Sequence, residues 1–296
     1  DANGCLLNAS FTLLDPPAFT LSVASATDVS CPGGNTGAID ISASNDPLVP
    51  PANPGLLISE FLADPVGTDS PFEWVELIAT KSIDFSVTPY TVVVANNGTA
   101  NVKGWRAGAA LTYAFQISSG VVNPGDVFYV GDSSMAPTGT KLRTINNATT
   151  AGDGFGNVGG SIGNGGANAD AVAVFNMPSS LIDSSKVPVD AIFFGSGLGS
   201  AIVNGGLNGY TLPTNDRYAG GLLSAGAFTA PNSASGSHHV ATGGFNISTG
   251  TYTSIRNWTL SPTFTDGTSA ITISINNTYS WSNGATTQDV SGLAAG

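Results

Sequence analysis

Hydrophobic residues in this chain occur in short runs of strand length, separated by clusters of Gly, Pro, Asn and Asp. The clearest runs fall at Ile58 and Phe61, Trp74, Val75 and Leu77, 92–94, Phe115, 127–130, 171–175 and 191–194. Short apolar runs between turn residues are typical of the strands of a β-sandwich. No amphipathic segment with a 3.6-residue period extends beyond two turns. The pattern therefore predicts an all-β fold.

Composition supports this prediction and bounds the size of the fold. The 296 residues suffice for one large or two ordinary domains with real hydrophobic cores. The 38 Gly and 17 Pro, with abundant Ser, Thr and Asn, indicate many tight turns. A hydrophobic share of 41% argues against a disordered acidic tail, because disorder requires low hydrophobicity.

The charge balance restricts the partners. Twenty acidic residues face eight basic ones, which gives a net charge of -12. Such a surface repels phosphate backbones and anionic lipid, so nucleic acid is excluded as a partner. No run of about 18 apolar residues occurs, so we expect no membrane-spanning segment.

The two ends of the chain carry its most specific motifs. Residues 1–5 read DANGC, residues 27–37 read TDVSCPGGNTG, and residues 279–296 read YSWSNGATTQDVSGLAAG. These segments resemble the SprB-type repeat of gliding-motility and surface adhesins from the Bacteroidetes. Modules of that family begin with a VSC-x-G pattern and close with a strand that ends in DANGC. The resemblance covers roughly 80 residues and implies immunoglobulin-like β-sandwich modules in a tandem repeat.

The motif order is rotated here, because the closing motif comes before the opening one. The resemblance implies that residues 1–16 are the closing strand of a preceding or neighbouring module. Residues 17–48 and 266–296 would then be the first and second parts of one SprB-like module. The second boundary is open, because AITISI at 270–275 echoes AIDIS at 38–42.

Residues 49–265 form a long insert between these two parts. LLISEFLADP at 56–65 and FEWVEL at 72–77 resemble the opening of a lamin-tail domain, in which an acidic loop joins two strands. NDRY at 215–218 and RNWT at 256–259 resemble a bacterial elaboration of that domain. The resemblance implies a lamin-tail-like sandwich inserted into the SprB-like sandwich.

Cys5 and Cys31 are the only cysteines. In the tandem array that the resemblance implies, Cys31 pairs with the equivalent of Cys5 in an adjacent unit. A local Cys5–Cys31 bond is the alternative, and two free thiols are a third. We expect a disulfide, because the composition suits an extracellular protein, and we leave its partner open.

All three glutamates, Glu60, Glu73 and Glu76, lie close together in the sequence, with Asp64 and Asp69 between them. Two strands joined by a loop would bring these carboxylates near one another. Glu60, Asp64, Asp69 and Glu73 could ligate Ca²⁺, which prefers several hard oxygens. A carboxylate pair could also hydrolyse glycosides if it flanked a cleft. We favour a structural, hydrogen-bonded role, because carboxylate pairs without a cleft rarely prove catalytic.

The glycine-rich stretch 151–170 offers a second candidate Ca²⁺ site at Asp153, Asn157 and Asp170. The spacing matches neither an EF-hand nor a nonapeptide β-roll, so a packed loop is the favoured interpretation. No strand-to-helix junction accompanies the glycines, so they do not form a nucleotide cradle. We expect no cofactor, and Ca²⁺ is the one ion that these residues could hold.

His238 and His239 are the only histidines. Adjacent residues of a strand point to opposite faces, a zinc site would need a third ligand, and no G-x-S-x-G motif supplies a nucleophile. We therefore predict a solvated loop or strand here, and no enzyme. The basic residues are scattered and should pair with nearby carboxylates, as Arg217 could with Asp216.

These observations predict a non-enzymatic structural and adhesive repeat unit of a large, secreted cell-surface protein or extracellular filament. The expected partners are copies of itself, adjacent repeats and surface glycans. The alternative is a glycan-binding accessory module of a secreted enzyme. An exposed row of Trp74, Trp105, Trp258 or tyrosine residues on one face would favour that alternative.

Overall fold

The computed structural model divides the chain into two compact units by its contacts. One unit comprises Asp1–Pro50 and Asn277–Gly296, and the other comprises Pro51–Asn276. The structure describes residues 19–27, 37–45, 53–96, 104–105, 112–145, 162–167, 169–196, 210, 229–248, 250–254, 256–274 and 290–293.

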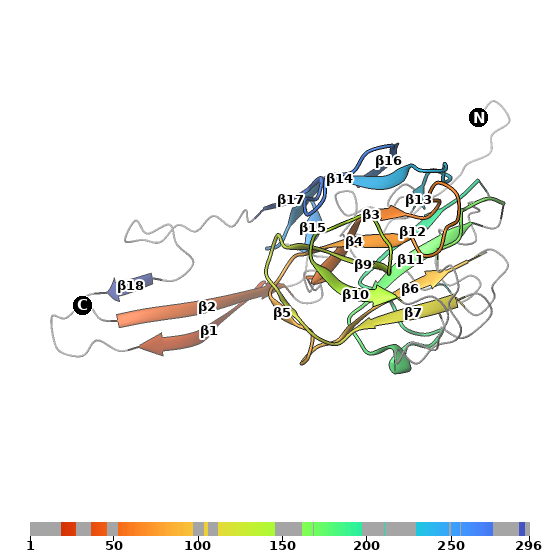
Figure 1. The fold of residues 1–296 in the computed structure, drawn as a ribbon. Coiled ribbons are helices and arrows are strands. Elements are labelled where there is room, and N and C mark those ends of the chain that lie inside the picture. The colour runs from red at the N-terminus through yellow and green to blue at the C-terminus, as the bar shows by residue number, and fades with distance from the viewer. Residues whose placement is uncertain are drawn as a thin grey trace, which may run out of the picture. The chain divides into compact units, whose positions relative to one another are not determined.

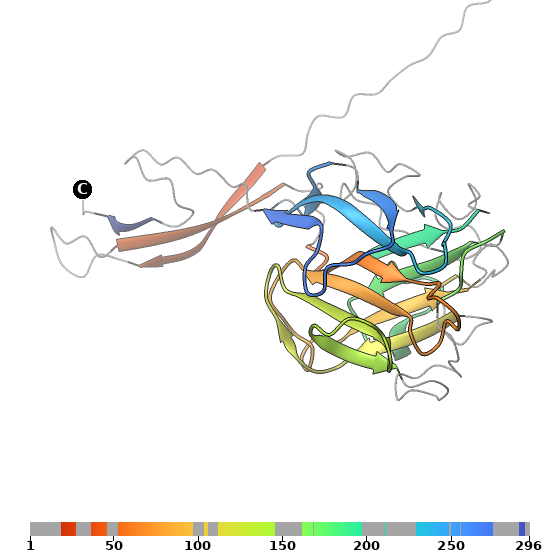
Figure 2. The ribbon, with the colours of Figure 1, turned by 45° about the horizontal axis from the view of Figure 1, so that its top comes forward.

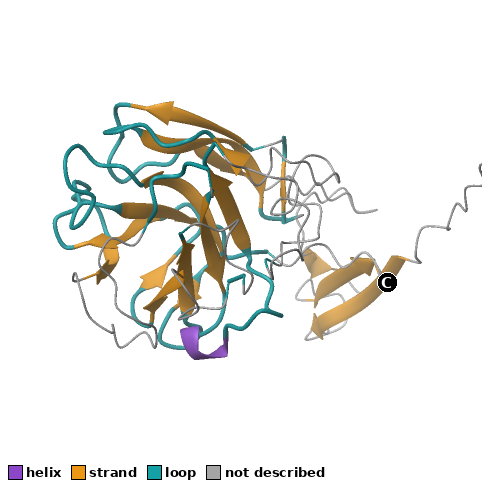
Figure 3. Cartoon of the chain, turned by 90° about the vertical axis from the view of Figure 1, so that its right-hand side faces the viewer, coloured by secondary structure: helices purple, strands orange, loops and turns teal. Residues whose placement is uncertain are grey.

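The predicted all-β class is confirmed. Apart from one 3₁₀ turn, Ser179–Leu181, every regular element in the described part of the chain is a strand. Figure 3 shows this turn in purple among the orange strands. Tight turns and β-branched runs explain the result, because they favour pleated backbone over helix.

The first unit contains a three-stranded antiparallel sheet in the order β1-β2-β18 (Figure 1). Its strands are β1 (Phe19–Thr27), β2 (Gly37–Asn45) and β18 (Val290–Leu293). Val290 in β18 lies opposite Ile39 in β2. Segments from both flanks of the second unit thus share one sheet. The expected closing strand 1–16, with Cys5, and the position of Cys31 lie outside the described residues.

The second unit is a sandwich of two sheets, which Figure 2 shows edge-on. The first sheet has the order β10-β9-β4-β3-β14, with further strands paired to β14. Its strands are β3 (Leu56–Leu62), β4 (Trp74–Ala79), β9 (Val127–Asp132), β10 (Lys141–Ile145), β14 (His238–Asn246), β15 (Thr251–Tyr252), β16 (Asn257–Ser261) and β17 (Ile271–Ser274).

The second sheet has the order β13-β12-β11-β6-β7. Its strands are β6 (Tyr90–Ala95), β7 (Thr112–Ile117), β11 (Asp170–Phe175), β12 (Asp190–Phe194) and β13 (Thr229–Ala230). A separate short pair joins β5 (Ile83–Asp84) to β8 (Val121–Val122). The apolar runs that predicted strands at 92–94, 171–175 and 191–194 coincide with β6, β11 and β12.

The main core lies between the two sheets, and the alternation of side chains along the strands builds it. Val75 and Leu77 of β4 belong to this core, whereas Trp74 belongs to a second apolar cluster with Tyr129. Phe61 of β3 meets Phe194 of β12 across the core at 4.9 Å between ring centroids. A strand residue and its neighbour point to opposite faces, so the first sheet also carries an outer face, away from the second sheet.

One expected domain boundary is corrected. We expected the second part of the terminal module to begin at 266, but Ile271 pairs with Gly243 of β14. Asp266 also accepts hydrogen bonds from the backbone amides of Thr138 and Gly139 at 2.7 and 3.0 Å. The boundary instead follows Asn276. The similarity of residues 270–275 to residues 38–42 suggested the wrong module, because alternating β-branched residues fit any sheet edge.

Candidate functional site

A row of directly opposite residues crosses five strands on the outer face of the first sheet. Tyr129 lies opposite Glu76, Glu76 opposite Glu60, Glu60 opposite Val240, and Val240 opposite Thr259. The row places two carboxylates side by side on neighbouring strands. Like charges directly opposite one another destabilise a sheet, so this arrangement requires compensation.

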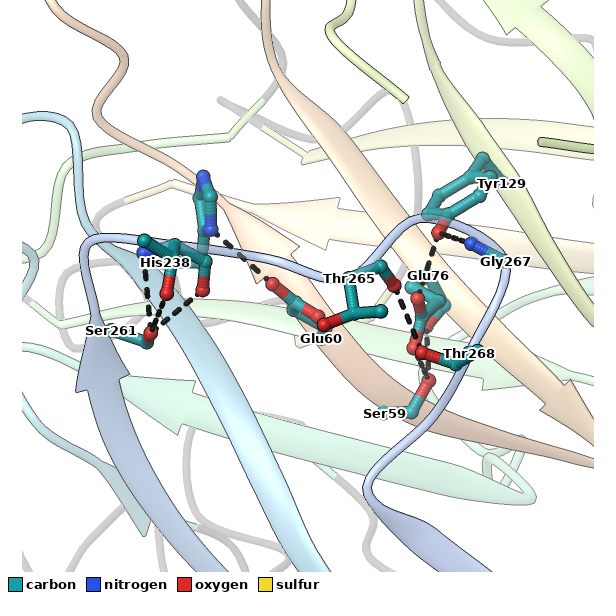
Figure 4. Close-up of polar contacts among 10 residues, drawn as sticks. Ser59, Glu60, Glu76, Tyr129, His238, Ser261, Thr265, Gly267 and Thr268 are labelled. Carbon is teal, nitrogen blue, oxygen red and sulfur yellow. Dashed lines mark hydrogen bonds and ion pairs between the residues drawn. The ribbon is translucent and has the colours of Figure 1, made fainter. Parts of the chain in front are cut away.

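Residues 262–270, between β16 and β17, cover this row and are called the covering loop below (Figure 4). The half-buried Phe264 packs against the Trp74 ring at 5.6 Å between centroids. The backbone amide of Gly267 donates a hydrogen bond to Tyr129 Oη at 2.9 Å. The loop is therefore fixed by an apolar anchor at Phe264 and by polar anchors at Gly267 and Asp266.

A β-bulge places a hydrogen-bond donor beside the buried carboxylate of Glu76. The register of β3 against β4 shifts between Ile58 and Glu60, and Ser59 lies at this irregularity. Ser59 Oγ donates to Glu76 Oε1 at 2.7 Å, and Tyr129 Oη donates to Glu76 Oε2 at 2.9 Å (Figure 4). Burial raises the pKa of Glu76 to about 7, and the charge of Glu60 adds to this effect, while the two hydroxyl donors oppose it.

Tyr129 remains a hydrogen-bond donor throughout the physiological pH range. Burial raises the pKa of its phenol well above the usual value, and the neighbouring Glu76 raises it further. The Gly267 amide opposes both effects. Tyr129 thus joins the sheet to the covering loop by donating to Glu76 and accepting from Gly267.

Glu60 is less well satisfied than Glu76. Only 4% of Glu60 is exposed, and its Oε1 lies 3.3 Å from Nδ1 of the buried His238. Neither of these two atoms makes a hydrogen bond within the described residues. Their separation exceeds the usual range for N–H···O bonds. Glu60 therefore keeps unused acceptor capacity.

The prediction of a solvated segment at the histidines was wrong. His238 and His239 lie in β14 and are 6% and 0% exposed. They point to opposite faces, as expected: His239 stacks on Phe61 at 4.2 Å between centroids, and its Nε2 lies 2.9 Å from the Pro231 carbonyl oxygen. Burial lowers the pKa of His239 to about 4, against the opposing effect of the Pro231 carbonyl. Tertiary packing, which hydropathy does not reveal, buries this strand.

An open pocket of about 470 Å³ lies between the outer face and the covering loop. Glu60 lines it, together with Val240, Phe264 and Ala270. The remaining lining residues all carry hydroxyl groups: Thr259, Ser261, Thr263, Thr265, Thr268 and Ser269. The pocket thus combines one carboxylate, many hydroxyls and one aromatic ring.

Three carboxylates of the two expected Ca²⁺ sets have hydrogen-bond partners of their own. Three of them accept hydrogen bonds from 162–167 of the glycine-rich stretch: Glu73 from Ile162 N at 3.1 Å, Asp69 from Asn164 Nδ2 at 3.0 Å, and Asp170 from Gly165 N at 2.6 Å. Among the described residues, no three His, Cys, Asp or Glu are grouped as a metal site would need. Asp64 is half-buried, and its carbonyl oxygen accepts from Gly236 N at 2.7 Å. Asp153 and Asn157 lie outside the described residues, so Ca²⁺ binding there stays a prediction.

One buried acid escaped the motif search. Asp132, at the end of β9, is 1% exposed, and burial raises the pKa of its carboxyl to about 6. The Glu73 amide and the Ser70 hydroxyl act in the opposite direction. The apolar run before Asp132 does not indicate that this carboxyl is buried. Its burial depends on residues 70–73, which fold over it.

A second buried polar cluster lies inside the sandwich. Arg256 donates two hydrogen bonds to Asp190, from Nη1 at 2.7 Å and from Nη2 at 3.0 Å. The Ile58 amide adds a third at 2.8 Å. The guanidinium also lies over the Tyr252 and Trp258 rings, at 5.3 and 5.2 Å. Both charged side chains are fully buried, so this ion pair has a structural role and is called the interior pair below.

The expected pairing of basic residues is therefore confirmed at Arg256, although its partner is distant in sequence. Lys186 also pairs, with Asp183 at 4.0 Å on the surface. Arg217 and Asp216 lie outside the described residues.

Trp74, Trp105 and Trp258 do not form an exposed row. Trp74 and Trp105 are 0% exposed, and Trp258 is 8% exposed. These three rings are therefore packing residues rather than a flat platform for sugars. Within the part of the chain that the structure describes, no helix is long and apolar enough to span a membrane.

Comparison of the chain with protein-family models, curated proteins and solved structures finds no match. The resemblances to the SprB-type repeat and to the lamin-tail domain remain predictions from motifs.

Proposed function

We propose that this chain is a structural and adhesive repeat unit of a large, secreted bacterial surface protein or extracellular filament, and that it works without catalysis. The pairing of β2 with β18 is the observation that carries this proposal. One strand precedes the Pro51–Asn276 unit and the other follows it, yet both lie in one sheet. A module that is closed from both flanks of an insert is the arrangement expected when a domain is inserted into a repeat.

Assembly follows from the edges of the terminal sheet. Within the described residues it has three strands, with β1 and β18 at its edges. A sheet edge presents unpaired amide and carbonyl groups that a strand from another unit can satisfy. Residues 6–14, in the closing strand of the motif, are the segment that we propose is donated between units or successive repeats.

The composition suits an adhesive surface. Charged residues make up 9% of the chain, and small polar residues are abundant. Such a surface favours hydrogen bonding to glycans and to neighbouring units over ionic binding. We also propose extracellular localisation and a disulfide at Cys5 and Cys31, either to each other or to their equivalents in adjacent units.

The geometry of the carboxylate pair supports a role without catalysis. Both oxygens of Glu76 already accept hydrogen bonds, from Ser59 and Tyr129. Tyr129 is itself fixed to the covering loop through Gly267. A glycosidase needs two carboxylates that face the scissile bond from a cleft, and Glu76 is committed within the fold instead.

Light scattering on the full chain tests the proposed assembly. The intact chain should form oligomers whose mass grows with concentration, and a variant with residues 1–16 replaced by an equally long Gly/Ser segment should remain monomeric. Equal urea unfolding of the Pro51–Asn276 unit in both proteins would show that the replacement acts on assembly alone. Normal oligomers from the variant, or monomers from both proteins, would reject strand donation.

Adhesion is tested with beads that carry the full chain. These beads should stay attached under flow to polysaccharide-coated glass, and beads that carry an unrelated protein of similar charge should detach. Equal retention of the two kinds of bead would reject the adhesive role.

A further inference from the structure

The pocket beneath the covering loop contains a buried carboxylate with unused acceptor capacity. Glu60 lines this pocket and is 4% exposed. Its nearest base is His238, whose Nδ1 lies 3.3 Å from Glu60 Oε1, and this oxygen makes no hydrogen bond among the described residues. Buried polar atoms in folded proteins are almost always satisfied, so an unsatisfied carboxylate oxygen beside a cavity points to a ligand.

The other walls of the pocket match a hydroxylated ligand. Thr259 on β16 and Thr265 on the covering loop are exposed, and their hydroxyls make no hydrogen bond within the described part of the chain. Each hydroxyl can both donate and accept. The half-buried Phe264 ring supplies an apolar wall. The volume of about 470 Å³ lies within the range of small-molecule sites.

Other ligand classes fit less well. An anion would meet the Glu60 carboxylate and the net charge of -12. A divalent cation would need several hard oxygens with charge, and Glu60 is the only carboxylate among the lining residues. A single ammonium group would use Glu60 but leave most of the hydroxyl wall unused.

We propose that this pocket binds one residue of a neutral sugar, with Glu60 accepting hydrogen bonds from sugar hydroxyls. Thr259 and Thr265 bond further hydroxyls of the same ring from the sheet side and the loop side. Phe264 contacts the apolar C–H face of the sugar, as aromatic side chains do in partly wet sites. Glu60, Thr265 and Thr268, drawn in Figure 4, line the same pocket on the sheet side and the loop side.

This inference deepens the proposed adhesive function, on which it rests, by naming the class of ligand. It does not depend on strand donation between units. Light scattering of the same samples separates the two: loss of sugar binding with normal oligomers would overturn only the pocket, and monomers that still bind sugar would overturn only the assembly.

The experiment titrates the full chain with single methyl glycosides of glucose, galactose, mannose and N-acetylglucosamine. Amide chemical shifts in an isotope-labelled sample report the site. We expect at least one glycoside to shift Thr259, Thr265 and Ala270 with millimolar affinity, since one sugar ring offers few contacts. Methyl glucuronide, lysine amide and CaCl₂ serve as probes of the competing ligand classes.

Two substitutions at exposed positions test the pocket without disturbing the core. Thr259→Val removes one hydroxyl and should weaken binding by about 3- to 10-fold. Ala270→Phe fills the pocket and should abolish the shifts. The matched controls are Thr272→Val on β17 and Ala234→Phe in the loop before β14, both at exposed positions outside the pocket lining. These controls should bind as the parent chain does.

Glu60→Gln replaces the charged acceptor and should weaken binding by about 10-fold or more, because bonds to a charged group are the stronger ones. The proposal is overturned if no neutral glycoside shifts the pocket residues, or if Ala270→Phe binds normally. Pocket shifts with lysine amide alone would reassign the site to an ammonium group, and shifts with CaCl₂ alone would reassign it to a cation.

Discussion

Two buried polar clusters in the same sandwich solve the problem of charge burial differently. Inside the sandwich, Asp190 and Arg256 form a bidentate pair. On the outer face, Glu60 and Glu76 lie directly opposite each other, with His238 as the nearest base to Glu60. Both clusters are almost completely shielded from solvent. They differ in what faces the carboxylate: Asp190 faces a guanidinium, whereas Glu60 lies opposite a second carboxylate.

The interior pair therefore has a fixed structural role, whereas the outer cluster can respond to its surroundings. The guanidinium of Arg256 also donates to the backbone carbonyls of Ile58 and Ala191 at 3.3 and 3.2 Å, so the interior pair ties strands of both sheets together. The outer cluster has two adjacent acids and an acceptor that faces a pocket. A bidentate ion pair resists change, whereas a carboxylate oxygen without a hydrogen bond can respond to protons and ligands.

The largest expected effect on stability comes from breaking the interior pair of Asp190 and Arg256. Asp190→Ala leaves the Arg256 charge buried without a partner and should lower the free energy of unfolding by about 3–5 kcal/mol. Urea denaturation monitored by tryptophan fluorescence measures the change, since Trp258 lies next to the guanidinium.

Two further variants delimit this prediction. Lys186→Ala removes a surface pair with Asp183 and should cost no more than about 0.5 kcal/mol. The double variant Asp190→Leu with Arg256→Met should recover much of the loss, because the desolvation penalty disappears with both charges. If Asp190→Ala lowered the free energy of unfolding by less than about 1 kcal/mol, the interior pair would not have this structural role.

The next largest effect concerns pH on the outer face. The raised pKa of Glu76, about 7 against 4.5 in the unfolded chain, means that the folded state binds more protons between these values. The contribution of Glu76 is therefore most favourable below pH 4.5 and falls by about 3 kcal/mol as pH rises to 7. Glu76→Gln removes this dependence, so its stability relative to the parent should rise over that window.

Unfolding free energies of parent and variant at pH 4.5 and pH 7.5 give the required difference. Taking the difference cancels the titration of Asp132 and His239, which is common to both proteins. Thr272→Val, at an exposed strand position without a titrating group, serves as the control. A stability difference that is the same at both pH values would contradict the raised pKa.

A smaller effect is expected where the covering loop meets the sheet. Phe264→Ala removes the half-buried ring that packs on Trp74 and should cost about 1–2 kcal/mol, less than a fully buried Phe. The Gly267 amide should then exchange its hydrogen faster, because the loop opens more often. Phe72→Ala, at a ring that is 40% exposed, should change neither quantity comparably. Unaltered exchange at Gly267 would show that Phe264 does not anchor the loop.

The smallest expected effect is spectroscopic and tests the opposite face of β14. Because burial lowers the pKa of His239 to about 4, its imidazole resonances should hardly move between about pH 8 and about pH 5. The stability linked to His239 is present above about pH 6.5 and is lost as pH falls toward 4. An NMR titration midpoint near 6.5 would contradict the burial of this ring.

Sequence patterns predicted the strands that are buried because their own residues are hydrophobic. The apolar runs at 92–94, 171–175 and 191–194 became fully buried strands because continuous hydrophobic runs suit a sheet covered on both faces. β14, which reads HHVATGGFN, was expected to be solvated. Its burial depends on rings from distant strands, such as Phe61, and composition cannot reveal them.

The candidate site was predicted only in part. The motif predicted that Glu60 and Glu76 lie close together in a structural, hydrogen-bonded role, and Glu76 makes such bonds. The donors Ser59 and Tyr129 did not, because a bulge and a third strand bring them to Glu76. The predicted boundary at 266 divided the covering loop between two modules, so the pocket beneath it could not be foreseen.

The pairing of β2 with β18 also defines a path for mechanical tension. When the chain is pulled from its two ends, the covalent route between these strands runs through the whole Pro51–Asn276 unit. The backbone hydrogen bonds between β2 and β18 provide a shortcut around it. Load then passes through the terminal sheet first, and the inserted sandwich is strained only after those bonds part.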